Sequence, residues 1–229
     1  MKTGIIILCR YNSSRLPGKI LKQINGKPIL QYILDRVSQV PSFDQVVVAT
    51  SSEASDDPII AFCQDHGIAH FRGSLNNVSE RFLACALTFG MDYAIRINGD
   101  NLFVDSHMIG EMIKIASLGK YDFITNVKGR TFPVGMSVEI VDVSFYQKII
   151  SQFDQAKYQE HVTLYFYEHE SAVKRPYFYE NTAVPEPKGL KLALDTQADF
   201  ERAEKMIMKM DKEHTCYQLQ ELTELVKEI

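Results

Sequence analysis

The sequence predicts an α/β fold, a three-layer αβα sandwich whose central sheet is mostly parallel. Two observations support this prediction. Short apolar runs, such as residues 4–8 and 44–50, alternate with longer segments in which apolar residues recur every three or four positions, a pattern typical of buried strands joined by amphipathic helices. A strand, a helix and a strand follow one another within the first 50 residues, and such crossover units join parallel strands.

Composition limits the class of protein. At 229 residues the chain is long enough for a sizeable core, and we expect one domain over residues 1–229. A net charge of −4 favours neither nucleic acid nor an anionic membrane as partner. No apolar run approaches the ~20 residues that span a bilayer, no signal peptide is recognised, and the scattered cysteines resemble neither a disulfide framework nor a zinc site. These features predict a cytoplasmic protein.

The first half of the chain is expected to contain three helices and three further strands. Each helix carries apolar residues three or four positions apart, and two begin at a proline. The paired Asp56 and Asp57 suit the N-terminus and dipole of the second helix. The expected elements are helices over residues 28–40, 58–66 and 79–89, and strands over residues 44–50, 68–71 and 93–100.

The second half is less regular. Asp105 is expected to cap the helix that follows it, and alternation of apolar residues predicts a strand before Asp195. The expected elements are a helix over residues 106–118, a helix that opens at residues 160–163, strands over residues 121–126, 175–180 and 190–194, a loop over residues 184–189, and final helices from residue 199 to residue 229.

A basic loop follows the first strand. Arg10, Arg15 and Lys19 lie among Asn and Ser residues, with Pro17 and Gly18 before the lysine and no acid between them. Turn residues can aim backbone N–H groups at an anion, and α/β folds bind polyphosphate with such loops at the carboxyl edge of the sheet. The alternative is an exposed basic turn. Neither a Walker A loop nor a G-x-G-x-x-G fingerprint is present, so the residues alone predict a phosphate site and favour a nucleotide.

Asp100 follows Gly99 at the end of a buried strand. An acid at this position can hold a metal ion over a ligand, and the alternative is a turn residue that caps the next helix. The residues alone leave both interpretations open.

Aromatic residues are concentrated in residues 158–180. They could stack on bases, but the surrounding acids argue against a nucleic-acid groove, and core packing or a dimer contact is favoured. His161 and His169 lie beside glutamates; histidines on such an aromatic helix are more often structural than zinc ligands.

Several motifs resemble the CMP-sugar-acid synthetases, the cytidylyltransferases for acylneuraminate and 3-deoxy-manno-octulosonate, and most of all their SpsF-like spore coat polysaccharide branch. The first is Arg10-x4-Arg15-Leu-Pro-Gly-Lys19, followed by the segment Asn-Gly-Lys-Pro-Ile-Leu over residues 25–30. Further matches are residues 71–74 with 78–82, residues 132–141, residues 160–163 and residues 194–200. The resemblance implies a Rossmann-like sheet of the nucleotide-diphospho-sugar transferase (GT-A-like) type.

The resemblance also implies roles for individual residues. The basic loop would bind the triphosphate of CTP, with Arg10, Arg15 and Lys19, together with Asp100, as the catalytic set. Asp100 and Asp195 would share Mg²⁺, and Asp199 would cap the last helices. The implied nucleotide-binding residues are Arg10, Asn12, Ser13, Ser14, Arg15, Gly18, Lys19, Arg72, Ser74, Arg81, Asn98 and Asp100, and the implied acceptor-binding residues are Glu139 and His161.

We therefore expect a Mg²⁺-dependent nucleotidyltransferase that transfers CMP from CTP to a sugar acid or related acceptor and releases pyrophosphate, for surface polysaccharide or glycoconjugate biosynthesis. A homodimer is expected, through a small aromatic-rich subregion around residues 125–182. One alternative is a GT-A-type glycosyltransferase that uses a nucleotide sugar, although the usual Asp-x-Asp is absent. Another is a nucleotide-binding protein that has lost catalysis, because Leu102 and Val134 stand where relatives often carry Pro and Asp.

Overall fold

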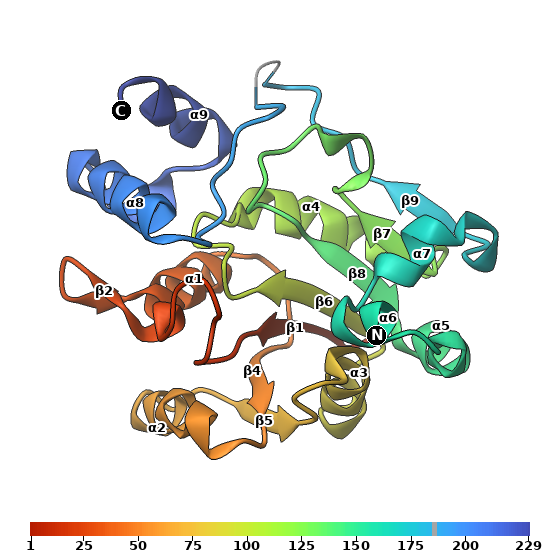
Figure 1. The fold of residues 1–229 in the computed structure, drawn as a ribbon. Coiled ribbons are helices and arrows are strands. Elements are labelled where there is room, and N and C mark those ends of the chain that lie inside the picture. The colour runs from red at the N-terminus through yellow and green to blue at the C-terminus, as the bar shows by residue number, and fades with distance from the viewer. Residues whose placement is uncertain (185–186) are drawn as a thin grey trace.

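The computed structural model describes residues 1–184 and 187–229, so Pro185 and Glu186 of the predicted loop lie outside the described residues. A seven-stranded sheet has the order β5-β4-β1-β6-β8-β7-β9 (Figure 1). Its strands are β1 (Thr3–Leu8), β4 (Gln45–Ser51), β5 (His70–Gly73), β6 (Tyr93–Asn98), β7 (Phe123–Thr125), β8 (Glu139–Asp142) and β9 (Pro176–Phe178), and a separate hairpin consists of β2 (Gln23–Ile24) and β3 (Lys27–Pro28). Only β8 runs antiparallel to its neighbours in the large sheet, so the prediction of a mostly parallel sheet is confirmed.

Helices cover both faces of the sheet, which confirms the three-layer sandwich (Figure 1). One face packs against α1 (Ile29–Ser38), α2 (Asp57–Asp65), α4 (Ser106–Ala116), α8 (Gln197–Lys209) and α9 (Leu219–Lys227). The other packs against α3 (Val78–Thr88), α5 (Val143–Ile149), α6 (Ala156–Glu160) and α7 (Leu164–Glu168). Short 3₁₀ turns are η1 (Lys19–Leu21), η2 (Ala54–Asp56), η3 (Lys128–Arg130), η4 (Ile150–Gln152), η5 (Glu170–Ala172) and η6 (His214–Cys216). No helix in the described part of the chain is long and apolar enough to cross a membrane.

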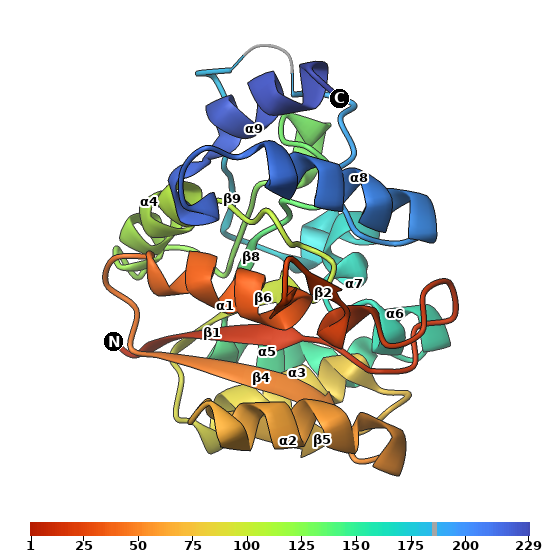
Figure 2. The same ribbon diagram turned by 90° about the vertical axis from the view of Figure 1, so that its left-hand side faces the viewer.

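The central strand explains this layering. Ile5, Ile6 and Ile7 on β1 are completely buried, because a parallel strand between two helical layers buries both of its faces. In the register of the sheet, Leu8 is paired with Ala49 on β4 and with Asn98 on β6. The carboxyl ends of these strands therefore meet at one edge, and the loop after β1 begins there (Figure 2).

Most predicted elements are confirmed within about two residues, the usual uncertainty of element ends. The caps predicted at Asp105 and Asp199 are also confirmed. The Asp105 carboxylate accepts a hydrogen bond from the Met108 N–H at the start of α4, and Asp199 forms a reciprocal capping box with Thr196 at the start of α8.

The local structure differs from the expectations at three places in the second half of the chain. Residues 190–194 form no strand and make one isolated bridge, between Val134 and Lys191. The helix expected to open at residues 160–163 begins slightly later: residues 161–163 join α6 to α7, and Thr163 is the N-cap of α7. Helix α5 was not anticipated, since its 7 residues are too few for a clear helical period.

Candidate active site

A cavity of about 260 Å³ lies at the carboxyl ends of β1 and β6. It brings together the basic loop after β1, Gly99 and Asp100 after β6, and Asp195. The predicted site residues that line it are Arg10, Ser13, Ser14, Arg15, Lys19, Arg81, Asn98, Asp100, His161 and Asp195. Segments that are up to 185 positions apart in the sequence (residues 10 and 195) thus meet in one cavity.

The cavity wall does not include Asn12, Gly18, Arg72 or Ser74. The Arg72 guanidinium pairs with Asp57 at 2.7 Å and donates to the Ser51 and Glu53 carbonyls. Arg72 therefore fastens the end of β5 to the segment before α2. Its Nε, Nη1 and Nη2 atoms all donate to these internal partners.

Gly18 and Ser74 shape the loops around the cavity. Gly18 has φ of 69° and donates its N–H to the Tyr11 carbonyl at 2.9 Å, a left-handed conformation that favours glycine. The Ser74 carbonyl accepts a hydrogen bond from Arg81 at 2.6 Å. Arg81 is 4% exposed, and its Nε has no partner among the described residues, so it is a buried cation in the cavity wall and not a solvated surface residue.

Asp56 anchors the basic loop. It was expected only to favour the N-terminus of α2, but its side chain makes no capping hydrogen bond there. Instead, this 1% exposed carboxylate accepts hydrogen bonds from the Tyr11 N–H at 2.7 Å, the Thr50 hydroxyl at 2.8 Å and the Ser51 N–H and hydroxyl. Burial raises the pKa of Asp56, but these hydrogen bonds outweigh burial and lower the pKa overall. Asp56 therefore ties the loop after β1 to the end of β4.

Asp100 has one carboxylate oxygen without a partner in the cavity. Its Oδ1 is buried and accepts no hydrogen bond from any described residue. Loss of hydration is the main reason why the pKa of Asp100 is raised; Lys19 opposes the shift and the Asp195 charge adds to it. An unpaired buried carboxylate oxygen is costly, and a divalent cation would satisfy it, so the side chain fits a Mg²⁺ ligand.

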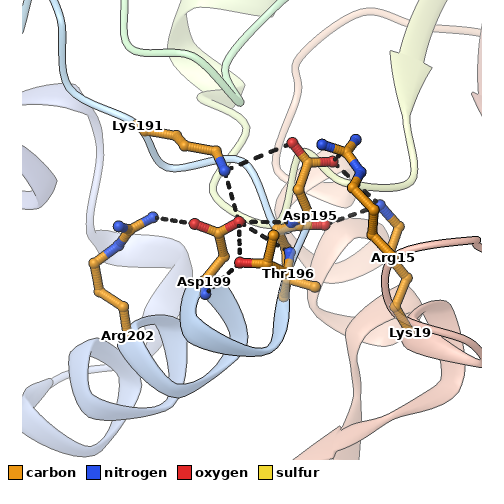
Figure 3. A network of polar contacts seen from close by, with 8 residues as sticks. Arg15, Lys19, Lys191, Asp195, Thr196, Asp199 and Arg202 are labelled. Carbon is orange, nitrogen blue, oxygen red and sulfur yellow. Dashed lines mark hydrogen bonds and ion pairs between the residues drawn. The ribbon is translucent and has the colours of Figure 1, made fainter.

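Asp195 differs from Asp100 because cations already surround it (Figure 3). Its Oδ1 accepts from Arg15 at 2.8 Å and lies 3.7 Å from Lys19 Nζ, while Oδ2 lies 3.7 Å from Lys191 Nζ. Lys191 in turn pairs with Asp199 at 2.6 Å. Two of the three cations expected to bind phosphate, Arg15 and Lys19, thus pair with the second predicted metal ligand.

The segment that carries Asp195 is also hydrogen-bonded to the backbone of Asp100. The Leu194 N–H donates to the Asp100 carbonyl at 3.1 Å, and the Leu194 carbonyl accepts from Lys19 Nζ at 2.8 Å. No group of three His, Cys, Asp or Glu side chains suited to a metal occurs within residues 1–184 and 187–229. A Mg²⁺ ion held here by Asp100 and Asp195 would therefore take its remaining ligands from phosphate oxygens and water, which is the usual habit of this ion.

A second cavity of about 640 Å³ adjoins the first and shares Arg96, Asn98 and His161 with it. Glu139 also lines this cavity but is 2% exposed. It forms an ion pair with Arg96, and its Oε1 accepts from the Thr163 hydroxyl at 2.7 Å and the Tyr167 hydroxyl at 2.6 Å. His161 is exposed and makes no side-chain hydrogen bond to a described residue.

Arg96 is the residue that the sequence argument missed. A signal was available, because Arg96 and Asn98 are two positions apart on β6, and alternate residues of a strand point to the same face. This alternation puts Arg96 on the same face of β6 as Asn98, directly before Gly99 and Asp100. It therefore places the Arg96 cation near Asp100, the predicted metal ligand.

Comparisons with known proteins agree with this geometry. A family model described as "Cytidylyltransferase" matches residues 4–228. The chain is 33% identical over 211 residues to the spore coat polysaccharide biosynthesis protein SpsF of Bacillus subtilis, covering 89% of this chain and 85% of that protein. A solved cytidylyltransferase structure from Leptospira borgpetersenii is similar with a TM-score of 0.91 and 31% identity, covering 100% of this chain and 94% of that one. A CMP:2-keto-3-deoxy-manno-octonic acid synthetase solved with CTP has the same fold, with a TM-score of 0.67 and 18% identity over 91% of this chain and 99% of that one.

Proposed function

The chain belongs to the cytidylyltransferase family, and from this premise we propose that it transfers CMP from CTP to a sugar acid or a related acceptor and releases pyrophosphate, with Mg²⁺ as cofactor. The observation that carries the proposal is that Arg15 and Lys19 of the basic loop line the same cavity as Asp100, whose Oδ1 has no hydrogen-bond partner among the described residues. The name of the Bacillus subtilis relative supports a product used in polysaccharide biosynthesis.

Each part of the cavity has a task in this reaction. Arg10 is exposed and has no partner among the described residues, so it is free to meet the triphosphate. Arg15 and Lys19 would exchange Asp195 for phosphate oxygens when CTP enters, and Asp195 would then join Asp100 at the metal. When bound, Mg²⁺ supplies charge neutralisation at the phosphate oxygens.

The proposed transfer is a direct displacement at the α-phosphorus. The acceptor hydroxyl oxygen forms the new bond to phosphorus, and the bond from that phosphorus to the bridging oxygen breaks. Pyrophosphate leaves with the electron pair of that bond, held by the basic loop, and the hydroxyl proton passes to solvent water. The residues of this chain contribute by positioning the groups and by stabilising charge.

Cytosine is the expected base. Phosphate-binding cations do not distinguish bases, so the preference for CTP must come from polar groups that face the pyrimidine edge, since a site built for a polar group rejects analogues that leave it unpaired. We expect CTP with Mg²⁺ to raise the thermal midpoint more than UTP, ATP or GTP does, and to support pyrophosphate release with a sugar-acid acceptor. Equal effects of UTP or a purine triphosphate would contradict the choice of base. Failure of all four nucleotides to bind would contradict the proposed function.

We also propose that the protein is a single-domain homodimer that uses the subregion around residues 125–182. The sequence favoured a dimer because this subregion is rich in aromatic residues, but the structure supports it for a different reason. Tyr158 and Phe166 are buried within the chain's own core, so the aromatic content of the region does not by itself require a partner. Strand β9, however, is the last strand of the sheet, and among the described residues β7 is its only partner; a free strand edge can pair with another chain. We expect sedimentation at tens of micromolar to give the mass of a dimer, and a monomer would refute this proposal.

A further inference from the structure

Arg96 lies at the boundary between the two cavities. It projects from β6 near the sheet edge that carries Asp100, and it lines the first cavity together with Lys19 and the second together with Glu139. Arg96 and Asp100 line the same cavity, and the Arg96 charge opposes the rise in the pKa of Asp100 that burial causes. In the proposed reaction the α-phosphorus and the acceptor hydroxyl must meet at this boundary.

The contacts of Arg96 leave part of its guanidinium available. Arg96 is directly opposite Glu139 in the antiparallel pairing of β6 with β8, and the two side chains form an ion pair. The other carboxylate oxygen of Glu139 is held by Thr163 and Tyr167. Arg96 Nε, in contrast, is buried and has no hydrogen-bond partner among the described residues. The Arg96 side chain is 16% exposed, and its Nη2 also has no partner among the described residues, so this end of the guanidinium can donate to a ligand in the cavity.

The second cavity is positively charged overall. Glu139 is the only acidic residue among the described residues that line it, whereas Arg96, Lys128 and Arg130 are basic. Lys128 is paired with Glu170 at 2.9 Å, but Arg130 has no partner in the described structure. Because both oxygens of the Glu139 carboxylate already accept hydrogen bonds, the cavity offers its ligand mainly donors and positive charge, and this chemistry favours an anionic ligand.

We propose that Arg96 binds the acid group of the acceptor and so selects sugar acids over neutral sugars; this inference rests on the proposed function. Arg96 would hold the acceptor's carboxylate at the boundary, which places a hydroxyl next to that carboxylate within reach of the α-phosphorus. Glu139, predicted from the sequence to bind the acceptor, is instead a positioning residue. It orients Arg96 and is itself oriented by Thr163 and Tyr167.

The test compares Arg96→Gln and Arg96→Lys with the wild type, using 3-deoxy-manno-octulosonate and its uncharged methyl ester as acceptors. Loss of a hydrogen bond to a charged group costs about 1.5–3 kcal/mol, so kcat/KM for the acid should fall by at least about tenfold in Arg96→Gln. The value for the ester should change little, and Arg96→Lys should recover part of the preference because it keeps the charge but loses the planar fork. Equal losses for acid and ester, or no loss for the acid, would overturn the inference.

A matched control separates selectivity from folding. Arg175 also pairs with a buried carboxylate, Asp122, at 2.5 Å, but it lines neither cavity. Arg175→Gln should therefore lower the unfolding midpoint, as Arg96→Gln does, without changing the ratio of acid to ester turnover. If the ratio falls equally in both variants, the effect of Arg96 is structural and the inference fails.

If the wild type shows no turnover, acceptor binding is measured instead of activity. Binding of 3-deoxy-manno-octulosonate is then measured by saturation-transfer NMR, with CMP present to fill the first cavity. Loss of the signal in Arg96→Gln but not in Arg175→Gln would support the anion site even though the proposed function had failed. An unchanged signal in Arg96→Gln, or no signal in the wild type, would reject the site. The thermal shift with CTP, which reports the first cavity, should be retained in Arg175→Gln, because Arg175 lines neither cavity.

Discussion

Replacing Asp100 with asparagine is expected to lower pyrophosphate release by about 10³-fold, because metal stabilisation of phosphoryl charge supplies several kcal/mol of a reaction barrier. The same change is expected to raise the thermal midpoint of the ligand-free protein at neutral pH. Asp100 Oδ1 has no partner among the described residues, and its pKa is raised mainly by burial. The charged form therefore costs stability in the folded protein, and asparagine removes that charge.

The difference in thermal midpoint between Asp100→Asn and the wild type should depend on pH. A carboxylate whose folded pKa lies above the ordinary value of 3.8 holds its proton more tightly in the folded state, so stability falls as the pH rises through the interval between the two pKa values. The midpoints of Asp100→Asn and wild type should therefore converge at pH values below the ordinary Asp pKa and separate at neutral pH. Differential scanning calorimetry from acid to neutral pH measures the gap. A midpoint lower than wild type at neutral pH would mean that Asp100 has a partner in solution.

Asp105 provides the matched control. It is also a buried aspartate near the end of β6, but its two oxygens accept from the Met108 and Leu219 N–H groups at 2.8 Å each. Asp105→Asn should lose one of these hydrogen bonds and lower the midpoint, with no loss of turnover comparable to that of Asp100→Asn. If both variants lose turnover equally, the effect at Asp100 comes from the loop and not from a metal.

Lys19→Ala is expected to lower turnover by about 10²-fold or more, because removing one group that stabilises transition-state charge typically has an effect of this size. Lys19 Nζ donates to the Leu194 carbonyl at 2.8 Å and lies 3.7 Å from Asp195. The loss in stability should be modest, about 1 kcal/mol for one hydrogen bond. Steady-state pyrophosphate release and chemical denaturation measure the two effects on the same preparation.

Lys27→Ala is the control for this variant. Lys27 pairs with Asp35 at 2.7 Å, and Lys27 is not part of the cavity wall. Its loss should leave turnover near wild type. Unchanged turnover in Lys19→Ala, together with a lower denaturation midpoint than in Lys27→Ala, would show that the basic loop is structural and that the phosphate site lies elsewhere.

The fold and the family could be read from local sequence. Apolar runs such as residues 4–8 identify buried strands because a strand between two helical layers has no polar face, and helical periodicity is equally local. The resemblance that begins at Arg10-x4-Arg15 is confirmed by the family match over residues 4–228. The meeting of this loop with Asp100 at one edge followed from the parallel sheet, because the carboxyl ends of parallel strands share an edge.

The sequence alone determined which residue types were available at the site: cations after the first strand, a carboxylate after Gly99 and an acid before the last helices. Only the tertiary structure decided which of them are free. Arg72 and Glu139 have internal partners, Asp56 anchors a loop instead of capping a helix, and Arg96 keeps an unpaired donor. The physical reason is that a polar group's availability depends on what faces it across the fold, and such partners lie far away in the sequence: Tyr11 is 45 positions from Asp56, and Asp195 is 180 positions from Arg15. Periodicity and short motifs describe one segment at a time and contain no record of such pairs.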